Sequence, residues 1–406
     1  MSKYFVNIFL ILLCLLSNIS CLFANNSNAI LLISLDGFRY DYIDRGLTPN
    51  MSKFADEGVR TQYLQSSYPT STFPNHISIV TGLYPKNHGI IANNFVDYSI
   101  NERFSIRDTN AVRNSKWYPK ETFWETCKKN NIISASYFWA GSELNDTSRN
   151  PNYYQRYDSK RDYLERVDGV LKWLDLPIDK RPQFISLYFD AADTYGHSFG
   201  TESKELNTAI HILDSVLNYL FIGLKQRGLY DKLNIIIVSD HGMTNLSKSK
   251  LINLETIIPE EYADIVNHTA YCFVQPKENY EQKVKELLEK HKLHYQFYDR
   301  DSIPERYNFR NNKRISKIFI MADCGWALTY NQKWDNKYQG THGYDNQWSD
   351  MLGFMIAKGP DFKSNYKSAG ILNIDIYPLM LKILNLNTDN KIDGKLERII
   401  HLLKNK

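Results

Sequence analysis

The sequence predicts an α/β protein with a mainly parallel central sheet and helices on both of its faces. Short apolar runs alternate with amphipathic segments along the chain, which is the pattern of repeated strand and helix units. The chain has 406 residues, of which 43% are hydrophobic and 23% charged, so it can bury a large core. Several apolar runs end directly in Asp or His, and open α/β sheets gather functional side chains at the carboxyl ends of their strands.

The expected elements follow one another without internal repeats or a Pro/Gly-rich linker. Short apolar, β-branched runs indicate strands at 30–35, 59–65, 132–138, 184–189, 235–239 and 352–357. Apolar residues at helical spacing, such as Leu206, Ile210 and Leu213, indicate helices at 50–57, 74–82, 161–174, 205–225, 280–290 and 374–384. Pro74 suits the first turn of the second of these helices.

Three polar stretches without clear periodicity interrupt the alternation, at 93–120, 141–160 and 293–315. Loops that bind substrate are usually carried at strand ends by a rigid scaffold. We therefore expect these stretches to be loop insertions over the C-terminal ends of the strands.

The N-terminus has the pattern of a signal peptide, with Lys3 followed by a nearly uninterrupted apolar run from Phe5 to Leu16. The run is short for a membrane span, although an uncleaved anchor is the alternative. We expect residues 1–24 to be removed and 25–406 to form a single catalytic domain. The mature protein would have no transmembrane span and would be secreted, periplasmic or extracellular.

Charge and cysteine content narrow the class of partner. The net charge is +4 with scattered Lys and Arg, which is too mild to favour a nucleic-acid polymer as partner. Cys127, Cys272 and Cys324 would remain after signal removal, so at most one disulfide can form within the chain. Because no Cys-x-x-Cys pair exists, a thiolate metal site is not expected.

Three carboxylates and three imidazoles follow predicted strands or lie in a turn beside one, which favours a metal site. Each alone could be a turn residue, a helix cap or a loop histidine, but their joint occurrence at several strand ends favours shared ligation. A mixed oxygen and nitrogen ligand set suits Zn²⁺, and the chain therefore has the pattern of a metal-dependent hydrolase. The six candidates are Asp36, Asp193, His197, Asp240, His241 and His342.

Specific motifs then identify a resemblance. Residues 35–39 (Leu-Asp-Gly-Phe-Arg), 69–76 (Pro-Thr-Ser-Thr-Phe-Pro-Asn-His), 81–90 (Thr-Gly-Leu-Tyr-Pro-Lys-Asn-His-Gly-Ile) and 239–243 (Ser-Asp-His-Gly-Met) resemble the nucleotide pyrophosphatase/phosphodiesterase family. That family belongs to the alkaline phosphatase superfamily, and the similarity continues through 138–142, 341–345 and 374–379. The resemblance implies an alkaline phosphatase-like fold over nearly the whole chain after the signal segment.

The resemblance also implies roles for individual residues. Thr72 would be the nucleophile and Asn93 a ligand of the transition state. Two zinc ions are implied. One would be held by Asp193, His197 and His342, and the other by Asp36, Asp240, His241 and the Thr72 oxygen.

These residue types suit phosphoryl transfer. A threonine hydroxyl is a poor nucleophile at neutral pH, and coordination to Zn²⁺ lowers its pKa. Two ions about 3.5–4 Å apart could clamp the phosphoryl group during in-line displacement. Thr72 would form a covalent ester with phosphorus, zinc-activated water would hydrolyse it, and the Asn93 amide would donate to a non-bridging oxygen.

The implied substrate is a nucleotide. Phe73 and Tyr157 match the positions that sandwich the base in nucleotide-cleaving relatives, although they could instead be loop aromatics that pack on an insertion. Trp139 and Glu143 would line the same pocket. The stretch from Asp190 to Asp193 departs from the family pattern, which more often has an acidic pair and a proline there, and this leaves the loop's shape open.

Other activities remain open. Some members of the family act on choline phosphodiesters or lysophospholipids, whose cationic head group suits aromatic and acidic walls. A phosphomonoesterase of the same superfamily would need extra positive charge, for which the sequence offers no clear candidate. A ligand-binding protein on a decayed hydrolase fold is the non-enzymatic alternative, and the complete ligand set with Thr72 argues against it.

Overall fold

A computed structural model describes residues 28–330 and 338–404. The predicted signal segment 1–24 lies outside these described residues. Among the helices within them, none is both long enough and apolar enough to cross a bilayer.

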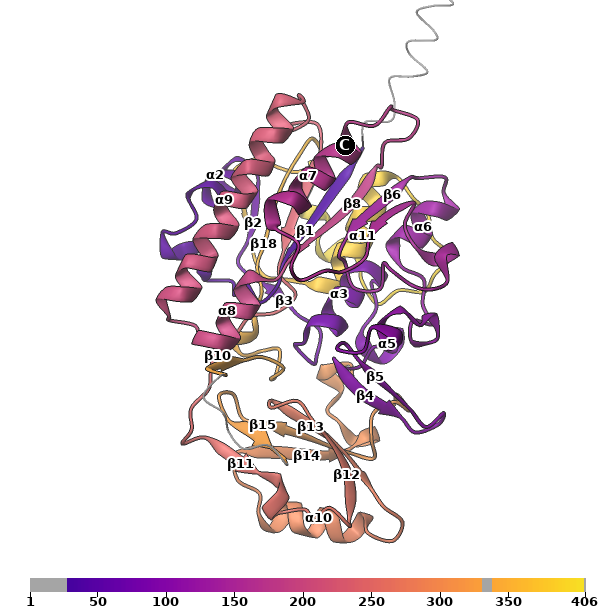
Figure 1. Cartoon of the computed structure of the whole chain (residues 1–406), viewed down its shortest axis with the longest axis vertical. Coiled ribbons are helices and arrows are strands. Elements are labelled where there is room, and N and C mark those ends of the chain that lie inside the picture. The colour runs from indigo at the N-terminus through magenta and orange to yellow at the C-terminus, as the bar shows by residue number, and fades with distance from the viewer. Residues whose placement is uncertain (1–27, 331–337, 405–406) are drawn as a thin grey trace, which may run out of the picture.

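The core of the fold is an eight-stranded sheet with strand order β19-β2-β18-β9-β1-β8-β6-β7 (Figure 1). β18 is antiparallel to both of its neighbours, and the other neighbouring pairs are parallel. The predicted α/β class with a mostly parallel sheet is confirmed. The strands are β1 (Ile30–Leu35), β2 (Val59–Thr61), β6 (Ser134–Tyr137), β7 (Tyr153–Gln155), β8 (Phe184–Phe189), β9 (Asn234–Val238), β18 (Met355–Lys358) and β19 (Tyr366–Ser368).

β1 shows how helices cover both faces of this sheet, because successive strand side chains point to opposite sides. Leu31, Ile33 and Leu35 belong to one buried cluster, with α2 (Pro49–Glu57), α7 (Tyr163–Leu174) and α9 (Lys204–Gln226). Ile30 and Leu32 belong to another, with α3 (Thr72–Thr81), α6 (Phe123–Lys129) and α11 (Ile376–Leu384). Full burial on both faces explains why the central strands read as continuous apolar runs.

A second, antiparallel sheet is inserted between β9 and β18, with strand order β12-β13-β15-β14 (Figure 1). Its strands are β12 (Ala263–Asn267), β13 (Tyr271–Pro276), β14 (Tyr295–Asp299) and β15 (Ile318–Ala322), and α10 (Glu281–Lys290) packs on it. The sequence predicted α10 but none of these strands. We expected 293–315 to be irregular, and this was wrong at β14, whose five residues mix aromatic and polar side chains.

The remaining insertions are more regular than expected. The stretch 93–120 contains the hairpin β4 (Asn94–Asp97) and β5 (Glu102–Ser105) and the helix α5 (Thr109–Arg113), and 141–160 contains the edge strand β7.

The single strand expected at 59–65 is divided into β2 and β3 (Leu64–Gln65), and β3 pairs with β20 (Ile371–Leu372). Other short elements are α4 (Pro85–His88), β10 (Thr244–Asn245), β11 (Leu251–Asn253), β16 (Ala327–Thr329) and β17 (Gly340–Thr341).

Candidate active site

The central strands of the large sheet bring most of the predicted ligands to one edge. Asp36 follows β1, and Asp240 with His241 follows β9, the neighbour of β1 on one side. On the other side of β1, β8 leads into α8 (Ala191–Phe199), which carries Asp193 and His197. His342 follows β17, which pairs with β10 just beyond His241. The structure therefore brings together all six candidates from four separate segments.

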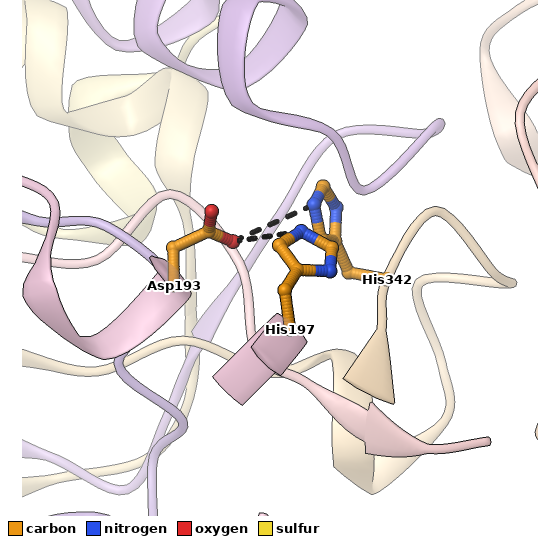
Figure 2. A group of neighbouring side chains, drawn as sticks. All are labelled: Asp193, His197 and His342. Carbon is orange, nitrogen blue, oxygen red and sulfur yellow. Dashed lines mark ion pairs between the residues drawn. The ribbon is translucent and has the colours of Figure 1, made fainter. Parts of the chain in front are cut away.

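Asp193, His197 and His342 form the first group, with one ligand atom of each within 4.8 Å of the others (Figure 2). Asp193 Oδ1 lies 3.3 Å from His197 Nε2 and 3.6 Å from His342 Nε2. Asp193 and His197 are four residues apart on α8, so both face the same side of the helix.

Asp36, Asp240 and His241 form the second group, again with ligand atoms within 4.8 Å of one another. His241 Nε2 lies 3.4 Å from Asp36 Oδ1 and 3.1 Å from Asp240 Oδ2. All three side chains are buried.

The two groups adjoin. The rings of His241 and His342 stack with centroids 3.6 Å apart, and Asp193 N–H donates to the Asp36 carbonyl at 3.0 Å. Gly37 makes this approach possible, because a Cβ there would lie 2.8 Å from Asp193 Cα and its φ is +66°. The arrangement has room for two centres side by side.

The hydrogen bonds of the two ligand groups leave carboxylate oxygens available for divalent cations. One buried oxygen of each carboxylate has no hydrogen-bond partner among the described residues, namely Asp36 Oδ1, Asp193 Oδ1 and Asp240 Oδ2. The second oxygen of Asp36 accepts from Tyr188 OH at 2.5 Å, and that of Asp240 accepts from Gly37 N–H at 3.1 Å. Unpaired carboxylate oxygens that converge in a buried site are costly unless a cation neutralises them.

The hydrogen bonds of the three imidazoles also leave one ligand atom of each ring available for a metal. Nδ1 of His197, His241 and His342 lies 2.8, 2.8 and 2.7 Å from the carbonyl oxygens of Gly340, Gly242 and Thr70 respectively. Donation from Nδ1 to a carbonyl leaves the Nε2 lone pair for a metal, which is the usual arrangement of histidine ligands.

Burial and mutual repulsion govern the ionisation of the groups without metal. Burial, and then the nearby carboxylates of Asp240 and Asp193, raise the pKa of Asp36. Burial also raises the pKa of Asp240 to about 8. Burial acts in the same direction on Asp193, but attraction to His197 and the other imidazoles outweighs it and lowers the pKa of Asp193. A bound cation would favour the ionised form of all three.

Thr72 is the first residue of α3, and its Oγ1 lies 3.4 Å from His241 Nε2. We expected this helix to open at Pro74, whereas it begins two residues earlier and fixes the hydroxyl beside the second ligand group. Asn93 Oδ1 accepts from the N–H of Phe73 at 2.9 Å, which leaves its Nδ2 group as a donor near the start of α3.

His76 supports both the helix and the ligands. It is buried, with Nε2 2.8 Å from Ser34 Oγ and Nδ1 2.8 Å from the Thr72 carbonyl. Its Nδ1 also lies 3.4 Å from Asp240 Oδ2, and burial lowers its pKa to about 4. The ring is therefore neutral at pH 7 and positions the Thr72 turn.

A cavity of about 270 Å³ opens from this centre. Thr72, Asp36 and Asp193 line it, as do the four residues predicted to bind substrate: Phe73, Trp139, Glu143 and Tyr157. Trp139 presents little surface, because it is 1% exposed and its Nε1–H donates to the His76 carbonyl. Tyr157 is 44% exposed and forms a part of the cavity wall that faces solvent.

Among the residues of the cavity wall that sequence reasoning missed, four make contacts that bear on the site. Arg113 pairs with Glu143 at 3.0 Å, and Phe138 packs edge-on against Tyr157 with centroids 5.3 Å apart. The other two, which the sequence placed beside metal ligands without assigning them a role, are Tyr188 and Asp190. The departure from the family pattern in the stretch from Asp190 to Asp193 was the available signal for this region.

Comparisons with known proteins show the family to which the chain belongs. The family model described as Type I phosphodiesterase/nucleotide pyrophosphatase matches residues 30–345. The chain is 37% identical to a venom phosphodiesterase of Naja atra over 400 residues, which covers 94% of this chain and 47% of that protein. It is 36% identical to human ectonucleotide pyrophosphatase/phosphodiesterase family member 1, covering 92% and 42%. The chain spans about half the length of these curated relatives.

Solved structures give the same result for the fold. Murine ectonucleotide pyrophosphatase/phosphodiesterase 5, as an inactive threonine-to-alanine variant in complex with AMP, matches with TM-score 0.89 and 30% identity. The human form of that protein matches with TM-score 0.89 and 31% identity, and each match covers 93% of this chain and 100% of the other. The chain therefore belongs to the Type I phosphodiesterase/nucleotide pyrophosphatase family of the alkaline phosphatase superfamily.

Proposed function

We propose that residues 25–406 form a zinc-dependent phosphodiesterase that cleaves phosphodiester or phosphoanhydride bonds of nucleotides and releases nucleoside 5′-monophosphates. The observation that carries this proposal is the placement of the Thr72 hydroxyl beside two adjoining ligand groups at the end of an aromatic cavity. The family membership and the AMP complex of the murine relative support it.

Asp193, His197 and His342 would hold one zinc ion, and Asp36, Asp240 and His241 would hold the other with the Thr72 oxygen. Bound zinc would supply Lewis acidity that lowers the pKa of the threonine hydroxyl and offsets phosphoryl charge. The three unpaired carboxylate oxygens and the oriented imidazoles support this assignment.

The chain's own residues would then carry the reaction. Thr72 Oγ1 attacks phosphorus as the bond to the leaving group breaks, which gives a covalent ester between Thr72 and the nucleoside phosphoryl group. Asn93 Nδ2 donates to a non-bridging oxygen while Phe73 N–H holds the amide in place. Water hydrolyses the ester, which releases the monophosphate and restores the hydroxyl.

Phe73 and Tyr157 would stack on the base from two sides of the cavity. The charges of the cavity favour a nucleotide over the alternatives. Arg113 is paired with Glu143, so neither a free cation for a phosphomonoester nor a free anion for a choline group is present in that pair. Asp190 is likewise paired with Arg166 at 3.1 Å.

The test combines substrate identity with one variant. Purified protein, with and without chelator, is assayed on ATP, a dinucleoside polyphosphate, a nucleotide sugar, glycerophosphocholine, and bis- and mono-p-nitrophenyl phosphate. We expect chelator-sensitive release of AMP from ATP and preference for the bis ester, with Thr72→Ala at least about 10³-fold slower. Phosphocholine as the main product, or more than a few per cent of turnover in Thr72→Ala, would refute the assignment.

We also propose export after removal of residues 1–24. The support is the charged and apolar pattern of the sequence. N-terminal sequencing of protein recovered outside the producing cell tests this, and an intact Met1 on that protein would contradict it.

A further inference from the structure

Asp190 is a carboxylate that lines the cavity and has no part in the mechanism above. It lies three residues before Asp193, at the N-terminal end of α8. Its side chain does not cap that helix, and it is 19% exposed. The side chain is thus available both to the protein behind it and to the cavity in front.

Among the described residues, hydrogen-bond donors contact one of the two Asp190 carboxylate oxygens. Arg166 Nη1 donates to Oδ1 at 3.1 Å, and Tyr163 OH donates to the same Oδ1 at 3.4 Å. No donor within 28–330 or 338–404 contacts Oδ2. Oδ2 is therefore a fixed hydrogen-bond acceptor with spare capacity.

The positive charge of Arg166 balances the negative charge of the Asp190 carboxylate. The Arg166 side chain is 0% exposed, and it also donates to the carbonyl oxygens of Tyr188 at 3.0 Å and Arg161 at 3.2 Å. Its guanidinium lies over the Phe138 ring, 5.0 Å from the centroid. Because a buried guanidinium needs a counter-charge, Asp190 serves first as its partner. A cationic ligand would compete with Arg166 for that charge, whereas a neutral hydroxyl would not.

Asp190 lies between the end of the cavity that would hold the phosphate and the end that would hold the base. Tyr188 places its hydroxyl on Asp36 at the metal end, and Tyr157 forms the aromatic end of the cavity. Asp190 lines the cavity with both tyrosines, whose ring centroids are 6.3 Å apart, and Arg166 Nη1 donates both to Asp190 Oδ1 and to the Tyr188 carbonyl. Asp190 therefore lies near both tyrosines. In a nucleoside 5′-phosphate, the sugar lies between the phosphate and the base.

We propose that Asp190 Oδ2 accepts a hydrogen bond from a ribose hydroxyl, which makes Asp190 a specificity-determining residue that favours nucleotides with an intact ribose over analogues that lack this hydroxyl. The proposal rests on the proposed function. A carboxylate is a strong acceptor for a sugar hydroxyl, and an acidic side chain performs this task in other nucleotide-binding folds.

The test compares kcat/KM of the zinc-loaded full chain for ATP, 2′-deoxy-ATP and 3′-deoxy-ATP. We expect ATP to be preferred over at least one deoxy analogue by about 10- to 100-fold, the range for a hydrogen bond to a charged acceptor. Asp190→Asn keeps an oxygen for Arg166 and Tyr163 but puts an NH₂ donor in place of Oδ2. In this variant the ratio of kcat/KM for ATP to kcat/KM for the disfavoured deoxy analogue should fall close to one, whatever the absolute rate.

Asp168→Asn is the matched control, because this carboxylate accepts from Tyr219 OH at 2.9 Å between α7 and α9, outside the cavity. It should keep the wild-type ratio. Equal kcat/KM for the three triphosphates in the wild type would overturn the proposal even if Asp190→Asn does not fold, as would a wild-type ratio in folded Asp190→Asn. Failure of the proposed function is distinguishable, because the wild type would then cleave neither the triphosphates nor bis-p-nitrophenyl phosphate.

Discussion

The imidazole rings of His241 and His342 are stacked, with centroids 3.6 Å apart and planes inclined by 13°. The two residues come from distant parts of the chain and belong to different ligand groups. Burial lowers the pKa of both rings, that of His342 to about 4, so both are neutral at pH 7 and can approach without charge repulsion. The stack is the physical link between the two proposed zinc sites.

Removing one histidine of the stack should remove one ion. His342→Ala is expected to bind about one zinc per chain instead of two, with activity reduced by at least about 10²-fold, since the first group keeps only two ligands. Atomic emission after dialysis counts the zinc. His211→Ala, at an exposed position on α9, is the control and should keep two ions. Two retained ions in His342→Ala would contradict the assignment of this ligand.

Tyr188 orients Asp36 through the 2.5 Å hydrogen bond to Oδ2, which leaves Oδ1 for the metal. Tyr188→Phe should therefore weaken zinc binding or lower kcat by about 10- to 100-fold, the usual effect of a group that orients a metal ligand. Competition with a zinc-binding dye measures the affinity. Tyr219→Phe also removes a hydroxyl that donates to an aspartate, Asp168, but far from the site, and should change neither quantity. Unchanged zinc affinity and kcat in Tyr188→Phe would show that the hydrogen bond is dispensable.

Asn93→Ala should lower kcat by about 10²- to 10³-fold with little change in KM, because the lost donor acts mainly on transition-state charge. Asn93→Asp keeps the oxygen that accepts from Phe73 N–H but loses the amide donor and adds a negative charge, so it should be at least as slow. Steady-state kinetics on bis-p-nitrophenyl phosphate gives both constants. A loss within a few-fold in Asn93→Ala would exclude this role.

The chelated protein should become less stable as pH rises from about 6.5 to about 8. In the folded chain the Asp240 carboxyl holds its proton up to a pKa of about 8, whereas an unfolded aspartate with its usual pKa of 3.8 has already lost it. The folded state therefore binds more protons in this window, and stability falls with pH. The raised pKa of His197 acts in the same direction, since its stabilising proton is lost as pH rises.

Below pH 6.5 the trend is offset, because His76 and His342 have pKa values lowered to about 4 and stay neutral while unfolded histidines become charged. Thermal unfolding of chelated protein at pH 6.5 and 8 measures the effect. Asp240→Asn should reduce it, and zinc should abolish it by holding the carboxylates ionised. A chelated protein whose Tm rises across this window would contradict the assignment.

Much of the fold could be predicted because its signals are local. The strands β1 and β8 were predicted at their observed bounds, and β9 within one residue, since buried parallel strands read as short apolar runs. The sheet of β12 to β15 was missed in part because β14 mixes polar with aromatic residues and pairs with β15, about 20 residues further along the chain. The hairpin of β12 and β13 and the apolar run of β15 were local signals that the sequence interpretation did not use.

The residues of the candidate site likewise divide into those that could be predicted from the sequence and those that could not. Asp36, Asp193, Asp240 and their histidine partners could be named from residue type and position, because strand ends of an α/β sheet meet at one edge. Arg166 could not, since nothing in α7 distinguishes a buried guanidinium from a surface one. Its role depends on Asp190 and Phe138, which reach it only in the folded chain.

The sequence by itself determined which carboxylates, imidazoles and hydroxyl group are the candidates for the site and their order along the chain. Only the tertiary structure decided that His342 stacks on His241, that Tyr188 donates to Asp36 and that no described residue donates to the second oxygen of Asp190. The reason is that side-chain periodicity is set by neighbours within a few residues, whereas these contacts depend on how distant elements pack. Packing selects which of many compatible polar groups become partners.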